Sequence, residues 1–325
     1  MTDSLLRITH PYGRKDEQMS AEGGTKAIVA ALLANTGIAI SKFVAAGITG
    51  SASMLAEGVH SVADASNQVL LLIGGKASRK AASPAHPFGY GRERYIYAFI
   101  VSIVLFSIGG VYALYEGYHK WHERGHGGEL ELPQVAVIVL LVAIVLESFS
   151  LRTAVKESNH VRGNQTWTQF IKGSRSPELP VILLEDIGAL VGLILALIGV
   201  GLSWITGDIL YDALGTFSIG VLLVLIAIVL AIEIRSMLIG ESATLEDIAA
   251  IEGAIKQDGT SQLIHLKTLH VGPDELLVAA KIGIDRSETG EQVAAEIDAA
   301  EARIRAAVPK AKLIYIEPDI PRTDA

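Results

Sequence analysis

The sequence predicts a polytopic α-helical membrane protein with six transmembrane helices, followed by a small cytoplasmic α+β domain. Half of the 325 residues are hydrophobic, and the mean hydropathy is +0.41. Before residue 240, apolar runs reach the length of about 20 residues that a helix needs to cross a bilayer. The pattern then changes to short amphipathic segments. We therefore expect a cytoplasmic segment over 1–26, a six-helix membrane domain over 27–240 and a cytoplasmic domain over 241–325.

Six apolar runs are long enough to span a bilayer, and an even number puts both ends of the chain on one side. Lysine and arginine are frequent before the first run and in the loops after the second and fourth runs, and rare in the opposite loops. The positive-inside rule therefore places both termini in the cytoplasm. Residues 1–25 lack the apolar core of a cleavable signal peptide. The runs lie near 27–49, 52–74, 95–117, 133–151, 180–204 and 213–238.

The cytoplasmic domain is predicted to have the element order αββαβ. Thr244 followed by Asp247 indicates a helix start, and Gly272-Pro273-Asp274 is a strong turn sequence between two strand-like runs. This order suits helices on one face of a sheet. The expected elements are a helix over 244–255, strands over 262–271 and 275–285, a helix over 293–308 and a strand over 312–317.

Charge is concentrated in this domain, where residues 241–325 contain 16 acidic and 9 basic side chains. This excess of acid argues against nucleic acid as a partner. A negative field also raises the local concentration of cations, although an ordinary solvated surface carries the same charge.

A polar stripe interrupts the second apolar run. Glu57, His60 and Asp64 lie three and four residues apart, so they share one helix face, and Asn67 or Gln68 continues it. A charged side chain at the centre of a membrane helix costs about 2.5–3.5 kcal/mol, and such residues usually mark ion or proton paths. An imidazole and a carboxylate at this spacing converge on one cation. Because the chain has no cysteine, His, Asp and Glu are the strong ligands available.

A second pair of acids, Glu185 and Asp186, lies in the fifth run. Adjacent helical residues point about 100° apart, so we expect one of the two to face a ligand site and the other to orient it or to pair elsewhere. Gly188 and Gly192 form a small-xxx-small step, which lets another helix approach closely.

Five segments resemble the cation diffusion facilitator family: SASMLAEGVHSVAD in the second run, the loop HPFGYGRERY, YDALGTFSIG in the sixth run, RSMLIGESA and the terminal IYIEPD. The likeness covers roughly residues 25–320 and is strongest to a bacterial and mitochondrial branch with a Glu-Asp pair in the fifth span. It implies a homodimeric antiporter that exports a divalent metal, usually zinc, in exchange for protons. It also implies a ferredoxin-like cytoplasmic domain that dimerises, no enzyme activity and no cofactor. We expect this protein in a bacterial inner membrane.

In that family, an H-x-x-x-D pair on the second span and a matching pair on the fifth bind the metal. His60 and Asp64 match the first pair. The second pair is altered, because placing either fifth-span acid in the pattern leaves an aliphatic residue, Ile182 or Ala189, at the partner position. The expected ligands are His60, Asp64 and a carboxylate of Glu185 or Asp186, with Glu57, Asn67, Gln68 and Asn35 as possible supporting residues.

This ligand set bears on the metal and on the mechanism. One imidazole among oxygen donors is a harder site than two histidines with two aspartates, so manganese, ferrous iron and cobalt are alternatives to zinc. Zinc comes first on family frequency. Because a ligating imidazole must be neutral and a ligating carboxylate ionised, metal and protons exclude each other at such a site. His60 is the expected titrating ligand.

The remaining histidines and span-edge charges are expected to be structural. The two histidines of the cytoplasmic domain lie five apart on a strand, so they face opposite sides. Charged residues at span edges commonly snorkel or pair near an interface, although Asn35 and Glu147 can line a hydrated path. The residues expected to be structural are His86, His119, His122, His126, His265, His270, Lys42, Glu116 and Glu233.

Two other classes of protein fit part of the pattern. An intramembrane metalloenzyme also binds zinc through His and acids, but the H-E-x-x-H motif is absent. A metal-binding membrane scaffold or regulator without transport activity is compatible with the altered fifth span. Metal flux through liposomes separates these classes from an antiporter.

Overall fold

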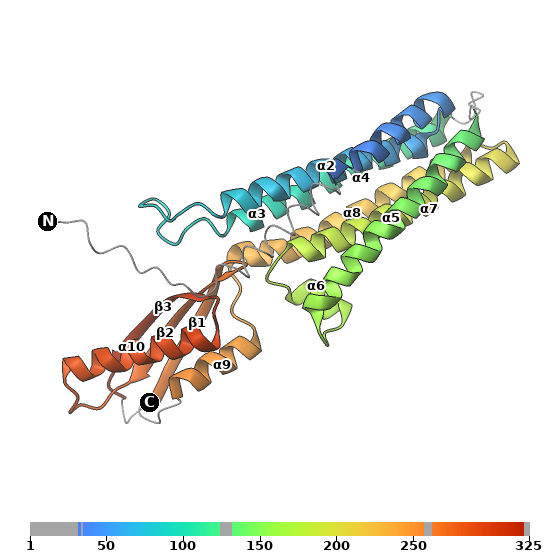
Figure 1. Cartoon of the computed structure of the whole chain (residues 1–325). Coiled ribbons are helices and arrows are strands. Elements are labelled where there is room, and N and C mark those ends of the chain that lie inside the picture. The colour runs from blue at the N-terminus through green and yellow to red at the C-terminus, as the bar shows by residue number, and fades with distance from the viewer. Residues whose placement is uncertain (1–31, 34, 124–131, 257–261, 322–325) are drawn as a thin grey trace. The chain divides into compact units, whose positions relative to one another are not determined.

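The computed structural model describes residues 32–33, 35–123, 132–256 and 262–321, which are mostly helical and include one small sheet (Figure 1). The chain forms two compact units. Unit 1 comprises the described residues up to Leu72 together with Tyr112–Leu146 and Val191–Gly220. Unit 2 comprises Ile73–Val111, Glu147–Leu190 and the described residues from Val221 onward.

Helices occupy all six predicted apolar runs, within the described residues. Three of them, α5, α7 and α8, are long and apolar enough to cross a membrane. Large apolar side chains such as Val142 and Phe149 are exposed on α5, as expected of a surface that faces lipid. Six membrane crossings stay a prediction. The first two runs form a helix over 35–49 and α2 (Ala52–Ala77). The third run forms α3 (Glu93–Ile100), the short π-helix η1 (Val101–Leu105) and α4 (Phe106–Glu123) in succession. The last three runs form α5 (Pro133–Arg162), α7 (Glu178–Thr206) and α8 (Leu210–Ile239).

Asp212 of α8 fixes the start of α2 in unit 1. Its carboxylate is fully buried and accepts hydrogen bonds from the Ser51 hydroxyl at 3.1 Å and the Ala52 backbone N–H at 3.0 Å. The first N–H groups of a helix have no partner within the helix, so this carboxylate acts as a cap supplied by another helix. The aspartate of the YDALGTFSIG segment therefore has a structural role.

Glycines let the helices of unit 1 approach closely. A Cβ added at Gly117 of α4 would lie 2.6 Å from the backbone nitrogen of Phe217 on α8. A Cβ at Gly199 of α7 would lie 2.9 Å from the Tyr211 carbonyl oxygen. Contacts of this kind are typical of membrane helices, where small residues allow close backbone packing.

A short helix, α6 (Trp167–Gly173), lies between α5 and α7. It starts with a capping box, in which the Thr166 hydroxyl accepts from the Gln169 N–H and the Gln169 side chain accepts from the Thr166 N–H.

The C-terminal domain, predicted to be cytoplasmic, has the expected αββαβ order. The sheet order is β1-β2-β3, with β1 and β2 antiparallel and β2 and β3 parallel. Thr244 begins the first helix as predicted, and its hydroxyl accepts from the Asp247 N–H at 3.2 Å. The elements are α9 (Leu245–Lys256), β1 (Gln262–Gly272), β2 (Glu275–Gly283), α10 (Gly290–Ala307) and β3 (Ala311–Asp319).

Alternate residues of β2 point into one core beneath the two helices. Leu276, Val278, Ala280 and Ile282 are buried there, as the period of two in a strand requires. Apolar side chains of α9 and α10 complete the same core, so both helices cover one face of the sheet. The residues from the helices are Ile251, Ala254, Ile255 and Ile304.

Candidate metal site

His60 and Asp64 lie side by side on α2 in unit 1. The distance from His60 Nδ1 to Asp64 Oδ1 is 3.6 Å, and their side chains are 2% and 7% exposed. Two ligands of one tetrahedral zinc ion stand about 3.3 Å apart, given metal–ligand bonds of about 2.0–2.1 Å. The observed separation is therefore close to that of a metal-binding pair. The spacing of four residues on a helix produces this geometry.

The stripe continues along α2 as the sequence predicts. Asn67 is buried, and the Oε1 atom of Gln68 is buried without a hydrogen-bond partner among the described residues. Asn35, on the preceding helix, is half-buried. Whether these three side chains support a bound metal stays a prediction.

Glu57 is engaged in an ion pair that the sequence did not indicate. Lys42, on the helix over 35–49, donates to Glu57 Oε2 at 3.0 Å and to the Ser61 hydroxyl at 2.8 Å. The Lys42 and Glu57 side chains are 3% and 0% exposed. Lys42 is thus paired, as expected, but it lies in the buried interior and does not snorkel to an interface.

The fifth-span acids lie on α7 in unit 2. Glu185 is 4% exposed and Asp186 is 8% exposed. The Ser150 hydroxyl of α5 donates to Asp186 Oδ2 at 3.0 Å, and Glu147, one turn earlier on α5, is also buried. Asp186 is therefore oriented by α5. Glu185 points about 100° away around the helix.

The predicted site draws its residues from both units. Within the described residues of either unit, no three His, Asp or Glu side chains gather closely enough to hold a metal ion by themselves. Both pairs are buried, and their joining in one site stays a prediction.

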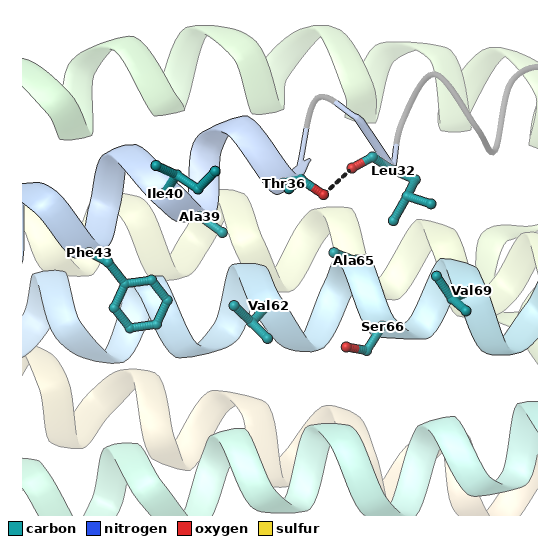
Figure 2. Close-up of a pocket in the computed structure, with 9 residues that line it drawn as sticks. All are labelled: Leu32, Thr36, Ala39, Ile40, Phe43, Val62, Ala65, Ser66 and Val69. Atoms are coloured by element: carbon teal, nitrogen blue, oxygen red, sulfur yellow. Dashed lines mark hydrogen bonds between the residues drawn. The ribbon is translucent and has the colours of Figure 1, made fainter.

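An apolar pocket beside α2 is not a candidate metal site. Figure 2 shows it between the helix over 35–49 and the face of α2 opposite the stripe, with the Thr36 hydroxyl donating to the Leu32 carbonyl at 2.7 Å. None of the described residues that line it is titratable. The lining residues are Leu32, Thr36, Ala39, Ile40, Phe43, Val62, Ala65, Ser66 and Val69.

The histidines after the third span stack on aromatic rings. His119 stacks on Tyr115 with ring centroids 5.8 Å apart, and His122 stacks on Tyr118 at 5.5 Å. These contacts favour the structural interpretation of both residues. His126 lies outside the described residues.

The histidines of the cytoplasmic domain face opposite sides of β1, as predicted. His265 is exposed, whereas His270 is 1% exposed. His270 Nδ1 lies 3.3 Å from the Gly272 carbonyl oxygen. Burial disfavours the charged imidazole and lowers the pKa of His270 below its ordinary value.

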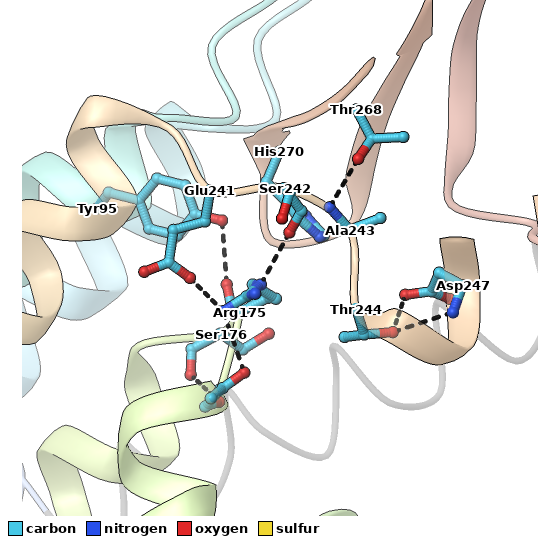
Figure 3. A network of polar contacts seen from close by, with 12 residues as sticks. Tyr95, Arg175, Ser176, Glu241, Ser242, Ala243, Thr244, Asp247, Thr268 and His270 are labelled. Carbon is cyan, nitrogen blue, oxygen red and sulfur yellow. Dashed lines mark hydrogen bonds and ion pairs between the residues drawn. The ribbon is translucent and has the colours of Figure 1, made fainter. Parts of the chain in front are cut away.

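A polar network in unit 2 joins the residues before α7 to the segment after α8 (Figure 3). Arg175 forms an ion pair with Glu241 and donates to the Ser242 carbonyl at 3.2 Å, while its own carbonyl accepts from the Tyr95 hydroxyl at 3.0 Å. Tyr95 belongs to the HPFGYGRERY segment, and Glu241 belongs to the RSMLIGESA segment. The sequence did not predict this network, because its members lie far apart along the chain.

Arg94 makes a second link of this kind. It forms an ion pair with Glu178 at the start of α7 and another with Asp274 in the turn after β1, at 2.7 Å. Nearby, a Cβ on Gly91 would lie 2.9 Å from the Val271 carbonyl oxygen, so the loop backbone touches the end of β1. The HPFGYGRERY loop therefore packs directly against the C-terminal αββαβ domain.

The sequence is similar to those of known membrane transport proteins. A family model described as the cation efflux transmembrane domain matches residues 28–239. The mitochondrial proton-coupled zinc antiporter SLC30A9 of Homo sapiens is 32% identical over 267 residues, which cover 81% of this chain and 46% of the relative. The Mus musculus protein of the same name is also 32% identical, over 268 residues, with 81% and 47% covered.

A plant relative extends the likeness to a metal tolerance protein. Metal tolerance protein C4 of Arabidopsis thaliana is 27% identical over 268 residues, covering 82% of this chain and 58% of the relative. The chain spans about half the length of the curated relatives that it matches.

Proposed function

The chain belongs to the cation efflux, or cation diffusion facilitator, family of membrane transporters, and from that premise we propose that it exports a divalent metal cation, zinc first, in exchange for protons. The family is not one of enzymes. The observation that carries the proposal is the buried His60–Asp64 pair on α2. The names of the relatives, a proton-coupled zinc antiporter and a metal tolerance protein, support it.

The proposed site takes His60 and Asp64 from α2 and Glu185 from α7. In unit 1 the Glu57 carboxylate stands against the backbone of α7, where a Cβ on Gly192 would lie 2.7 Å from Glu57 Oε1. The resemblance to the family, in which the second and fifth spans supply the metal ligands, supports an α7 carboxylate as the third ligand, and Glu185 is the one proposed.

Asp186 has a supporting role in this proposal. Its carboxylate is held by the Ser150 hydroxyl of α5, so it orients α7 beside the site. With one imidazole and two carboxylates, the site also accepts manganese, ferrous iron or cobalt more readily than a site with two histidines does.

Exchange follows from ligand chemistry. Metal binds when His60 is neutral and Asp64 is ionised, and protons on the same atoms exclude it. When the site faces the cytoplasm, the ligands lose protons and bind metal; when it faces outward, protons displace the metal. Transport then needs no cofactor. The protein acts as a homodimer through a ferredoxin-like cytoplasmic domain, with both termini in the cytoplasm of a bacterial cell.

Flux measurements test the proposal. The full chain is reconstituted in liposomes with a pH gradient and loaded with zinc, manganese, iron or cobalt. Asp64→Asn is expected to abolish flux, Glu185→Gln to lower it strongly and Asp186→Asn to lower it less. Glu116→Gln is a matched control, because Glu116 is a half-buried acid on α4 that is not among the proposed ligands.

Two outcomes would overturn the proposal. Normal flux in Asp64→Asn would remove the α2 pair from the site. Metal binding by the wild-type protein without flux in any pH gradient would instead identify a scaffold or regulator.

A further inference from the structure

The buried Lys42–Glu57 ion pair is not used by the proposed exchange. Lys42 Nζ lies 3.0 Å from Glu57 Oε2 and 2.8 Å from the Ser61 hydroxyl oxygen, and both charged side chains are almost fully buried. Glu57 and Ser61 flank His60 on the same helix. A full positive charge is therefore fixed beside the proposed ligands.

Stability does not explain the pair. Desolvating two charges costs more than their attraction recovers in many proteins, and well-packed apolar replacements are often neutral or stabilising. Within a membrane, ionisable groups are also costly to insert. The position of this buried pair next to His60 therefore points to an effect on the neighbouring site.

Glu57 has the chemistry of a metal ligand and lies next to the proposed site. It lies one turn before His60 on the same face of α2. Its Oε1 atom is buried, has no hydrogen-bond partner among the described residues and stands against α7 at Gly192. Such an oxygen, on an ionised carboxylate, is a strong donor for a hard cation.

We propose that Lys42 is a positioning residue that keeps Glu57 from binding the metal, an inference that rests on the proposed function. By doing so, Lys42 sets the metal affinity and selectivity of the site. The Lys42 ammonium neutralises the negative charge of Glu57. The α2 stripe then has a net charge of −1, that of the ionised Asp64 carboxylate. A free Glu57 carboxylate would add a negative charge and an oxygen donor. The site would then bind harder cations more tightly and release metal more slowly.

Three variants isolate this effect. Lys42→Met removes the charge and keeps an unbranched side chain, Lys42→Arg keeps the charge, and Lys42→Met combined with Glu57→Gln removes both charges together. Binding of Zn²⁺ and Mn²⁺ to the purified full chain is measured by calorimetry. KM and kcat are measured for both ions in pH-gradient liposomes.

The expected pattern is specific to a charge effect. Lys42→Met should bind Mn²⁺ at least about tenfold more tightly, since one added charge near a dication is worth several kcal/mol even at intermediate dielectric. KM and kcat for Mn²⁺ should both fall, because the ion is released slowly. Lys42→Arg and the double variant should return the Zn²⁺/Mn²⁺ preference to within about threefold of wild type.

Two results would overturn the inference. A folded Lys42→Met protein with unchanged Mn²⁺ affinity would make Lys42 a purely structural residue. A double variant that loses Zn²⁺ affinity would make Glu57 a true ligand.

If Lys42→Met does not fold, the Glu57→Gln variant tests whether Lys42 acts on the metal site. This variant leaves the ammonium unpaired beside the site, so it should weaken Zn²⁺ binding at least about tenfold, and the added Lys42→Met change should restore it. Failure of that restoration would refute the inference. These binding measurements are independent of flux, so loss of antiport in the wild type would refute the proposed function separately.

Discussion

Gly192→Ala is the sharpest test of how α2 meets α7 in unit 1. The added Cβ would lie 2.7 Å from Glu57 Oε1, closer than carbon and oxygen atoms normally approach. Glu57 cannot yield freely, because its other oxygen is held by Lys42 at 3.0 Å. Either the ion pair stretches or the helices separate. Overpacking of this kind costs about 1–3 kcal/mol.

Gly201→Ala is a matched control on the same helix, because no heavy atom lies within 4 Å of its added Cβ. It should change stability by no more than about 0.5 kcal/mol. Thermal unfolding in detergent, followed by size-exclusion chromatography, measures both variants; about 2–4 °C corresponds to each kcal/mol. Equal melting temperatures for the two variants would show that Glu57 does not pack against Gly192.

Three further predictions concern other contacts. Asp212→Ala removes the cap of α2 and leaves the Ala52 N–H without its partner, so it should lower stability by about 1–3 kcal/mol in the same thermal assay; an unchanged melting temperature would contradict the cap. Because burial lowers the pKa of His270, its unfolded form takes up protons more readily, so its contribution to stability is complete above about pH 6.5 and is lost as the pH falls below that value. His270→Gln should therefore flatten the fall in melting temperature between pH 7 and pH 5, and an equally steep fall would refute the assignment. Arg175→Ala and Glu241→Ala should show a coupling energy of about 0.5–3 kcal/mol in a double-mutant cycle, whereas additive effects would mean that the ion pair contributes nothing.

The cytoplasmic domain was predictable because its signals are local. The Gly272-Pro273-Asp274 turn and the alternation of β2 each act within a few residues, and the structure has strands where they indicate. The capping box of α10, Thr289 with Gln292, is another local signal that sequence inspection could have used.

The α2 stripe was predictable for the same reason, since helical periodicity alone puts His60 beside Asp64. The partner of Glu57 was not predictable. Lys42 is 15 residues earlier on another helix, and only packing brings the two together. The same holds for Asp186 and Ser150, which are 36 residues apart in the chain.

Charge balance explains why a site on α2 needs a second helix. Lys42 and Glu57 cancel each other, so the stripe contributes one net negative charge, that of Asp64, while His60 must be neutral to bind metal. A dication near the centre of a bilayer requires a second carboxylate, because an uncompensated charge there is costly. In the proposed site, a carboxylate of Glu185 or Asp186 on α7 brings that charge. Because Lys42 removes the charge of Glu57 from the balance, the proposed site takes its second negative charge from α7 and not from the stripe itself.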